Sequence, residues 1–197
     1  MRGLVQAVGE NRIALWSTKP REQKIIGPTD LSGRWADDAK DPRVGVLLSD
    51  AESTKMEYFL NSSTTAVSQN CLANDRQVIS MTTNLTSTAP RSGLPRSVTG
   101  VPKDIKRGSM LLNVRLVSPT GGHFTSVKVD GKAVGIYADQ WNRRHITWVQ
   151  IKLKPGQNRR VTANVTTAAD QDGNPIVTVT PGMTSQRNDF AVRSACS

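Results

Sequence analysis

Residues 144–167 read RHITWVQIKLKPGQNRRVTANVTT. Apolar and polar side chains alternate through Ile151 and Leu153, and they alternate again from Val161 to Val165. Successive side chains of a β-strand point to opposite faces, so this alternation predicts two half-buried strands. The intervening KPGQN has the proline and glycine of a turn. A hairpin at Pro155-Gly156 would place the two strands side by side.

Similar patterns occupy most of the chain on both sides of this segment. The further apolar runs read RVGVLLSD, KMEYFLNSS, TTAVSQN, QVISMTTNLTST, MLLNVRLVSP, FTSVKVDGKAVGIY and PIVTVTPG. We expect DAEST to turn the first run back on the second, and CLANDR to join the third and fourth runs. Asp130-Gly131 predicts a tight hairpin turn, because this dipeptide tolerates positive φ. Residues 55–60 predict a core strand, and residues 89–107, which are rich in proline and glycine, predict the longest loop.

The number and spacing of these runs indicate the fold class. Roughly nine strands follow Pro42 at steady spacing, and no helical period interrupts them. Thr, Ser, Val, Asn and Gly dominate this part of the chain, a composition that favours short strands over a helical bundle. We predict a mainly β protein in which residues 43–197 form an immunoglobulin-like antiparallel β-sandwich.

Residues 1–42 have a different pattern. Gly3–Glu10 carries apolar residues on one helical face, and Arg12–Trp16 is an apolar run typical of a short buried strand. A second helix is expected after Pro20, since proline is favoured in the first helical turn. The polar stretch that follows predicts a linker anchored by Trp35. The sandwich is thus expected to follow a short helix-strand-helix segment.

Charge and composition limit the partners and the compartment. The 197 residues carry a formal charge of +10, from 26 basic and 16 acidic residues. This balance suggests an anionic neighbour such as nucleic acid, phospholipid or a cell-wall polymer, or else a solvated basic surface. No segment approaches the roughly 18 apolar residues of a membrane-spanning helix. The first residues lack the features of a secretory signal, which places the protein in the cytoplasm if Met1 is the true start.

The two cysteines, Cys71 and Cys196, have no CxxC spacing and no histidine at ligand spacing, which argues against zinc. They are either two inert thiols or one disulfide. A bond closing so long a loop stabilises by about 4–5 kcal/mol in the chain-entropy model. We predict the disulfide, because Cys196 has no reactive group beside it in sequence, and a disulfide implies an oxidising compartment.

Two arginine clusters are the strongest surface candidates, NRRH at 142–145 and NRR at 158–160. If the KPGQN hairpin forms, the two clusters join in one patch that pairs with phosphates and stacks on sugars or bases. The alternative is that Trp148 belongs to the core and the arginines only edge a strand. The polymer-binding candidates are Trp141, Arg143, Arg144, Arg159 and Arg160.

No catalytic or metal-binding group stands out. His123 and His145 are expected in a turn and at a strand start, with no nucleophile and carboxylate adjacent in sequence. The aspartates Asp37, Asp38 and Asp41 lack the spacing of a calcium loop and indicate a solvated linker. We therefore expect a protein that is not an enzyme, without cofactor or metal.

Five segments together resemble one protein family. They read RIALWSTKPREQ, VGVLLSDAESTKMEYFL, VRLVSPTGG, LKPGQNRRVTANV and VTVTPGM. Over about Leu4 to Thr184 the chain resembles the C-terminal part of the actinobacterial envelope family catalogued as domain of unknown function four-zero-one-two. The departures are Leu47, where an aromatic residue is usual, and Ser49, where a small amide is common.

The resemblance implies a membrane-anchored parent protein with a large extracytoplasmic domain upstream of this chain. Residues 11–27 would then be the last strand and helix of that domain. The family has no established activity, so the resemblance implies compartment and architecture but not chemistry.

Three functions remain open. The preferred one is a non-catalytic, extracytoplasmic module of the cell envelope that contacts anionic wall or capsular polysaccharide. The second is an accessory domain of a polymer transferase whose catalytic part lies upstream. The third is a nucleic-acid binder, which the charge supports but which the 5% aromatic content and the absence of a known motif disfavour.

Overall fold

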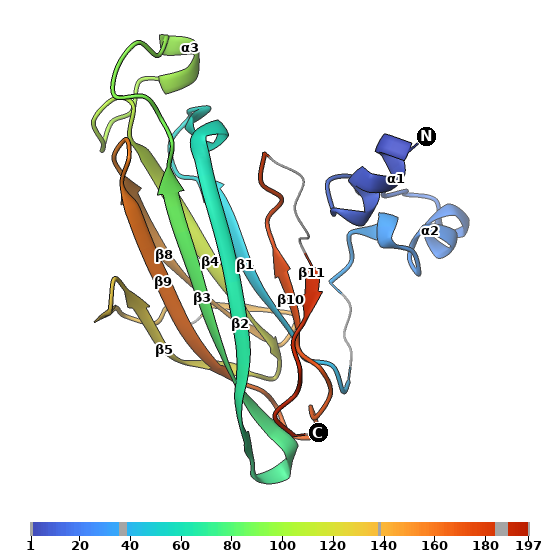
Figure 1. Cartoon of the computed structure of the whole chain (residues 1–197). Helices are drawn as coiled ribbons and strands as arrows, with labels where there is room; N and C mark the ends of the chain where they lie inside the picture. Colours follow the sequence, from blue (N-terminus) through green and yellow to red (C-terminus); the bar gives the residue numbers. More distant parts are fainter. Residues whose placement is uncertain (1, 36–38, 138, 184–188, 197) are drawn as a thin grey trace.

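The computed structural model describes residues 2–35, 39–137, 139–183 and 189–196. Two β-sheets face each other in it (Figure 1). The first sheet consists, in spatial order, of β11 (Asp189–Ala191), β10 (Ile176–Val179), β1 (Arg43–Asp50), β4 (Met110–Thr120), β8 (Arg144–Leu153) and β7 (Asp139–Trp141). The second consists of β2 (Leu60–Leu72), β3 (Arg76–Ser87), β9 (Asn158–Thr166), β5 (His123–Val129) and β6 (Lys132–Ala133).

All these strand pairs are antiparallel except β1 with β10, which is parallel. The predicted mainly β, antiparallel sandwich is therefore confirmed. Its immunoglobulin-like character stays a prediction, as does the division into residues 1–42 and 43–197.

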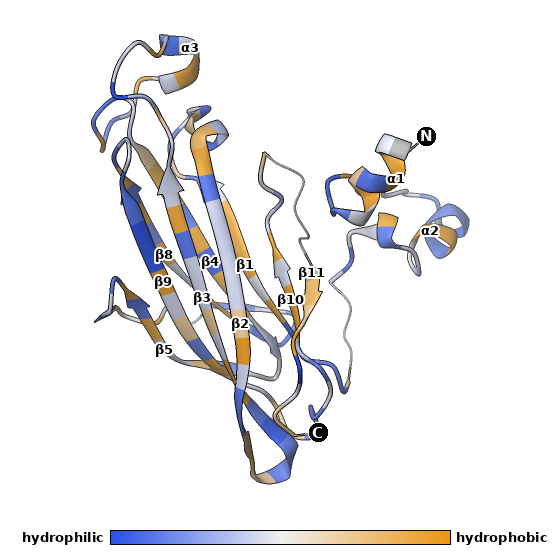
Figure 2. Ribbon diagram, in the orientation of Figure 1, coloured by the Kyte–Doolittle hydropathy of each residue, from blue (hydrophilic) through white to orange (hydrophobic). Residues whose placement is uncertain are grey.

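Alternation of apolar side chains builds the core between the sheets (Figure 2). Every second residue of β3 is buried, and β9 buries Val161, Ala163 and Val165 in the same way. From the facing sheet, β8 contributes Ile151 and Leu153. Burial of a side chain of this size stabilises by roughly 1.5–3 kcal/mol, so the inner faces hold the two layers together.

β8 and β9 do not form the hairpin that would join the two arginine clusters. β8 pairs with β4 and β7, whereas β9 pairs with β3 and β5 in the other sheet. KPGQN carries the chain from one layer to the facing layer. The apolar pattern fits both a hairpin and a crossing between sheets, because in either arrangement the two strands bury their apolar faces against the same core.

The predicted hairpin at DAEST is wrong for the same reason, since β1 and β2 belong to different sheets. The expected core strand at 55–60 is instead a 3-10 turn, η2 (Met56–Phe59). Met56 is fully buried in this turn, whereas Tyr58 is exposed. The chain crosses between the sheets in this turn, and Phe59 and Leu60 pack against the core beside Met56.

Other local predictions hold. CLANDR, with the short helix η3 (Ala73–Asp75), joins β2 to β3 as a hairpin. Asp130-Gly131 turns β5 into β6 with positive φ at both residues. Residues 89–107 form a long connection whose one described helix is the short α3 (Arg96–Thr99).

The N-terminal segment contains α1 (Arg2–Gly9), α2 (Pro20–Ile26) and the short helix η1 (Asp30–Ser32). The predicted strand Arg12–Trp16 is absent, and these residues run without regular structure. None of the described strands pairs with them, and Trp16 is 77% exposed. An apolar run forms a strand only where a partner strand satisfies its backbone, and here one bond joins the Leu15 N–H to the Leu31 carbonyl at 2.7 Å.

The predicted disulfide between Cys71 and Cys196 is confirmed. It ties the far end of β2 to the C-terminal segment. Ala195 strengthens the same contact, since its N–H donates to the Ser68 hydroxyl at 3.2 Å. Among the described helices, none is long and apolar enough to cross a membrane.

Candidate functional site

Trp35 fixes the N-terminal segment to the outer face of the first sheet. Its indole covers Gly45 of β1, where an added Cβ would overlap the ring. The ring also meets Trp141 edge-on, with centroids 6.2 Å apart, and the Arg144 guanidinium lies 5.7 Å from its centroid. The predicted anchoring role of Trp35 is confirmed, and Gly45 is the residue that makes room for it.

Arg144 is a structural residue rather than a surface one. Its side chain is only 3% exposed, and Nη1 donates to the carbonyls of Arg43 and Ser118, both at 3.1 Å. The β4–β8 ladder is irregular between Val117 and Thr120, so the Ser118 carbonyl lies outside the regular pairing. The guanidinium supplies that carbonyl with a donor, and the nearby indole lowers the cost of burying its charge.

The turn before Arg144 projects a second arginine outward. Asn142 and Arg143 have φ of 48° and 60°, and they connect Trp141 of β7 to Arg144 of β8, which pair directly. Positive φ at both central residues is typical of a tight hairpin turn. The Arg143 carbonyl accepts a bond from the Gly121 N–H at 2.8 Å, while its side chain is exposed.

These residues line a cleft of about 620 Å³, which we call the tryptophan–arginine cleft. Its lining residues are Ser32, Gly33, Arg34, Trp35, Trp141, Asn142, Arg143 and Arg144. Neither the Arg34 nor the Arg143 guanidinium has a hydrogen bond or ion pair within the described residues, and no described acidic side chain lines the cleft. Asp37 and Asp38 lie outside the described residues.

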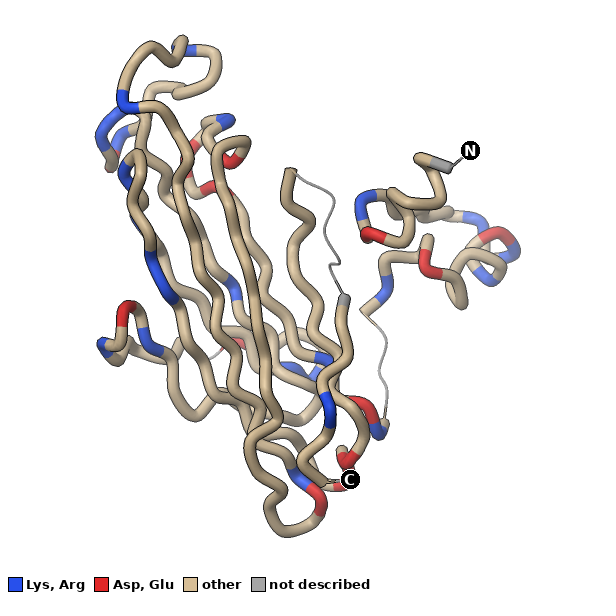
Figure 3. The backbone as a smooth tube through the Cα atoms, viewed as in Figure 1, with Lys and Arg blue, Asp and Glu red and all other residues tan. Residues whose placement is uncertain are grey.

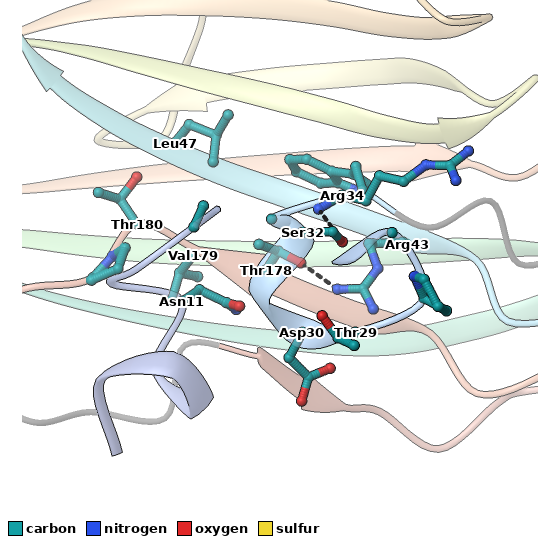
Figure 4. A pocket seen from close by; sticks show the side chains of 16 residues that line it. Asn11, Thr29, Asp30, Ser32, Arg34, Arg43, Leu47, Thr178, Val179 and Thr180 are labelled. Atoms are coloured by element: carbon teal, nitrogen blue, oxygen red, sulfur yellow. Dashed lines mark hydrogen bonds between the residues drawn. The ribbon is translucent and has the colours of Figure 1, made fainter. Parts of the chain in front are cut away.

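A second groove of about 720 Å³ adjoins the cleft, and both are lined by Ser32, Gly33, Arg34 and Trp35. Figure 4 shows this groove from close by. Arg43 lies in this groove and donates from Nη1 to the Thr178 hydroxyl at 2.8 Å. One acidic residue, Asp30, also lines it. The cleft and the groove together give a basic surface that continues on either side of one indole.

Arg159 and Arg160 do not join this cleft, so the prediction of one four-arginine patch is wrong. Arg144 begins β8, a strand of ten residues that spans roughly 30 Å, and Arg159 follows that strand's far end in the other sheet. Arg159 forms an ion pair with Asp130, and Arg160 donates from Nε to the Asn84 side chain at 3.1 Å. The Arg160 N–H and the Arg159 guanidinium hold the pKa of Asp130 below its usual value.

Trp148 and the histidines have other roles. Trp148 stacks on Tyr137 with centroids 5.4 Å apart and is 39% exposed, so it belongs neither to the core nor to the cleft. His123 is exposed, as expected. His145 is half-buried: the Phe124 N–H donates to its Nδ1 at 3.4 Å, and its Nε2 lies 3.2 Å from the Tyr137 carbonyl oxygen.

A pair of carboxylates lies at the other end of the first sheet. Burial, together with the negative charge of Asp50, raises the pKa of Glu57. Asp50 accepts bonds from the N–H groups of Glu52 and Thr54, at 3.0 and 3.1 Å. These bonds hold the turn after β1 in place. We therefore assign Asp50 a structural role in that turn.

Sequence patterns missed Arg34 and Arg43 as parts of the site. Both lie far from Trp141 in the chain, and the order of β1, β4 and β8 brings them to one surface. No local periodicity marks either residue. The adjacency of Arg34 to Trp35 is the one signal that the sequence offers.

The fold and the cleft define a β-sandwich protein with a basic surface cleft that contains two tryptophans. No family model matches the chain, and neither a curated protein nor a solved structure is significantly similar to it.

Proposed function

We propose that the chain is a non-catalytic binding module that contacts an anionic polysaccharide of the cell envelope through the tryptophan–arginine cleft. The observation that carries this proposal is the composition of one cleft: two indoles and three arginines, with the Arg34 and Arg143 guanidinium groups available to a ligand. Guanidinium groups form paired hydrogen bonds with phosphates and carboxylates. The Trp141 indole, which is 44% exposed, offers an apolar face against which a sugar ring can pack.

The disulfide supports a location outside the cytoplasm, because such bonds persist in oxidising compartments. The membrane-anchored parent protein that the family resemblance implies is part of the same proposal. The net charge of +10 favours association with anionic polymers in general. The cleft adds shape and aromatic surface to that general attraction.

The experiment measures retention of the purified chain on three immobilised polymers: a poly(glycerol phosphate) teichoic acid, polygalacturonate and neutral dextran. We expect binding to one or both anionic polymers at low salt, weakening as salt rises, and none to dextran. Arg34→Ser/Arg143→Ser should weaken binding by roughly tenfold, because two charge-assisted contacts are lost.

The matched control is Arg91→Ser/Arg96→Ser, which removes the same charge from exposed residues of the 89–107 connection. Binding that falls equally in both double variants would show that net charge alone is responsible and would refute the role of the cleft. Single-stranded DNA serves as the competitor. If it binds more tightly than either anionic polymer and depends on Arg34 and Arg143, the protein is a nucleic-acid binder instead.

A further inference from the structure

The four strands at the sheet edges differ in length and charge. β6, β7 and β11 have two or three residues each, and each contains a charged residue, namely Lys132, Asp139 and Asp189. β2 has 13 residues, LNSSTTAVSQNCL, with no charge, proline or glycine. Short or charged edges prevent strands of different molecules from pairing. β6 and β7 cover only part of β5 and β8, and β2 is the longest uncharged edge among the described strands.

One long side of β2 has an unpaired backbone, since β3 is its one neighbouring strand in the described part of the chain. Alternate residues of an antiparallel strand direct their N–H and C=O groups away from the partner. A bulge between Ser68 and Asn70 interrupts only the end near the disulfide. Figure 3 shows no charged residue along the strand. The stretch Leu60–Ser68 is therefore a template for another strand.

A groove of about 620 Å³ opens beside this stretch, between β2 and the first sheet. All five consecutive residues of Ser62–Ala66 line it. Because successive side chains point to opposite faces, this lining shows that the groove reaches the backbone edge of β2. The opposite wall includes the apolar residues Leu48, Phe190 and Val192, and Arg193 also lines the groove. A strand added to β2 would cover these apolar side chains.

We propose that β2 pairs antiparallel with β2 of a second copy of this chain, about a two-fold axis at Thr64. In this register Ser63 lies opposite Thr65 of the second copy, and Ser62 lies opposite its Ala66. The inward side chains of the incoming strand, Ser62 and Ala66 among them, then lie over the groove. The two sheets that contain β2 become one continuous sheet across the dimer.

A second copy is the occupant that the chain's own chemistry favours. Each copy carries a charge of +10, so two copies repel overall, and an interface between them has to avoid further close contacts between like charges. β2 meets this condition along its whole length. An antiparallel two-fold pairing also uses the same patch on both subunits, which is the commonest arrangement among homodimers. Small and β-branched side chains leave no bulky group to clash across the axis.

The test is the mass of the full chain in solution, measured by sedimentation equilibrium over a range of concentrations. We expect a reversible monomer–dimer equilibrium. Ser63→Lys/Thr65→Lys places like charges opposite each other at both contacts of the register, and both side chains are exposed in the monomer. The dimer dissociation constant should rise by roughly tenfold or more.

The control is Thr125→Lys/Asn158→Lys, which adds the same charge at exposed positions of the non-edge strands β5 and β9. It should leave the dimer constant unchanged. Amide hydrogen exchange gives a second readout, with residues 60–68 more protected at high concentration in the wild type and in the control. A wild type that stays monomeric, or a dimer that survives Ser63→Lys/Thr65→Lys, would overturn the proposal.

Discussion

The tripeptide NRR occurs twice in the chain, and its two copies have different structures. In Asn142–Arg144 the first two residues form a turn with positive φ, and the third is buried beside Trp35. In Asn158–Arg160 the backbone is an extended strand, and its arginines bond to Asp130 and Asn84 near the surface. The same three residues thus serve as a turn with a buried donor in one place and as a strand with surface contacts in the other. Tertiary neighbours decide between these roles.

The largest expected difference between the two copies concerns burial. Arg144→Met should lower the free energy of unfolding by about 3 kcal/mol, because two backbone carbonyls lose a charged donor. Arg160→Met should cost less than about 1 kcal/mol, since Arg160 is exposed and its N–H still bonds to Asp130. Urea unfolding of both variants measures the two values. Equal losses would contradict the assignment of Arg144 as a buried structural donor.

The second difference concerns backbone conformation and has opposite signs in the two copies. Arg143→Gly should stabilise the protein by roughly 0.5 kcal/mol, because glycine adopts positive φ without strain. Arg159→Gly should destabilise it by about 1 kcal/mol, because glycine weakens a strand. Thermal unfolding of the two variants is the measurement. The turn assignment fails if both substitutions destabilise to the same extent.

The smallest effect is electrostatic and belongs to the second copy alone. The pKa of Asp130 lies below its usual value when the protein is folded, chiefly because of the Arg160 N–H and then the Arg159 side chain. Asp130 therefore stabilises the fold above the pKa of the unfolded chain, and this contribution is lost as the pH falls through the folded-state pKa.

Asp130→Asn should cost about 0.5 kcal/mol at neutral pH, a small value because the pair is partly exposed. The difference from the wild type should vanish in acid, which urea unfolding across a pH series can measure. A difference that persists at the lowest pH would show that the carboxylate charge is not responsible.

Alternation predicted the faces of the strands but not the sheets to which they belong. β3 and β9 bury every second residue as their sequences indicate, and the predicted disulfide between Cys71 and Cys196 is confirmed. Periodicity reports which face of a strand is apolar. It cannot distinguish a hairpin from a crossing between layers, because both bury that face.

The candidate site was predictable only in part, for the same reason. Trp141 and Arg143 line the cleft as expected from their sequence cluster, while Arg159 and Arg160 lie in the other sheet. Arg144 can be buried because its guanidinium donates to the Ser118 carbonyl. That carbonyl is available because the pairing of β4 with β8 is irregular between Val117 and Thr120. Nothing beside Arg144 in the sequence signals that acceptor.

The parallel pairing of β1 with β10 has a consequence for how the protein is made. Arg43 aligns with Ile176, so the ribosome synthesises β10 long after β1 has emerged. Until then one side of β1 has no neighbour, and its sequence, RVGVLLSD, is rich in β-branched and aliphatic residues. Until β10 has been made, the nascent chain therefore carries an unpaired, aggregation-prone edge on β1, and this is the stretch that a chaperone would have to shield.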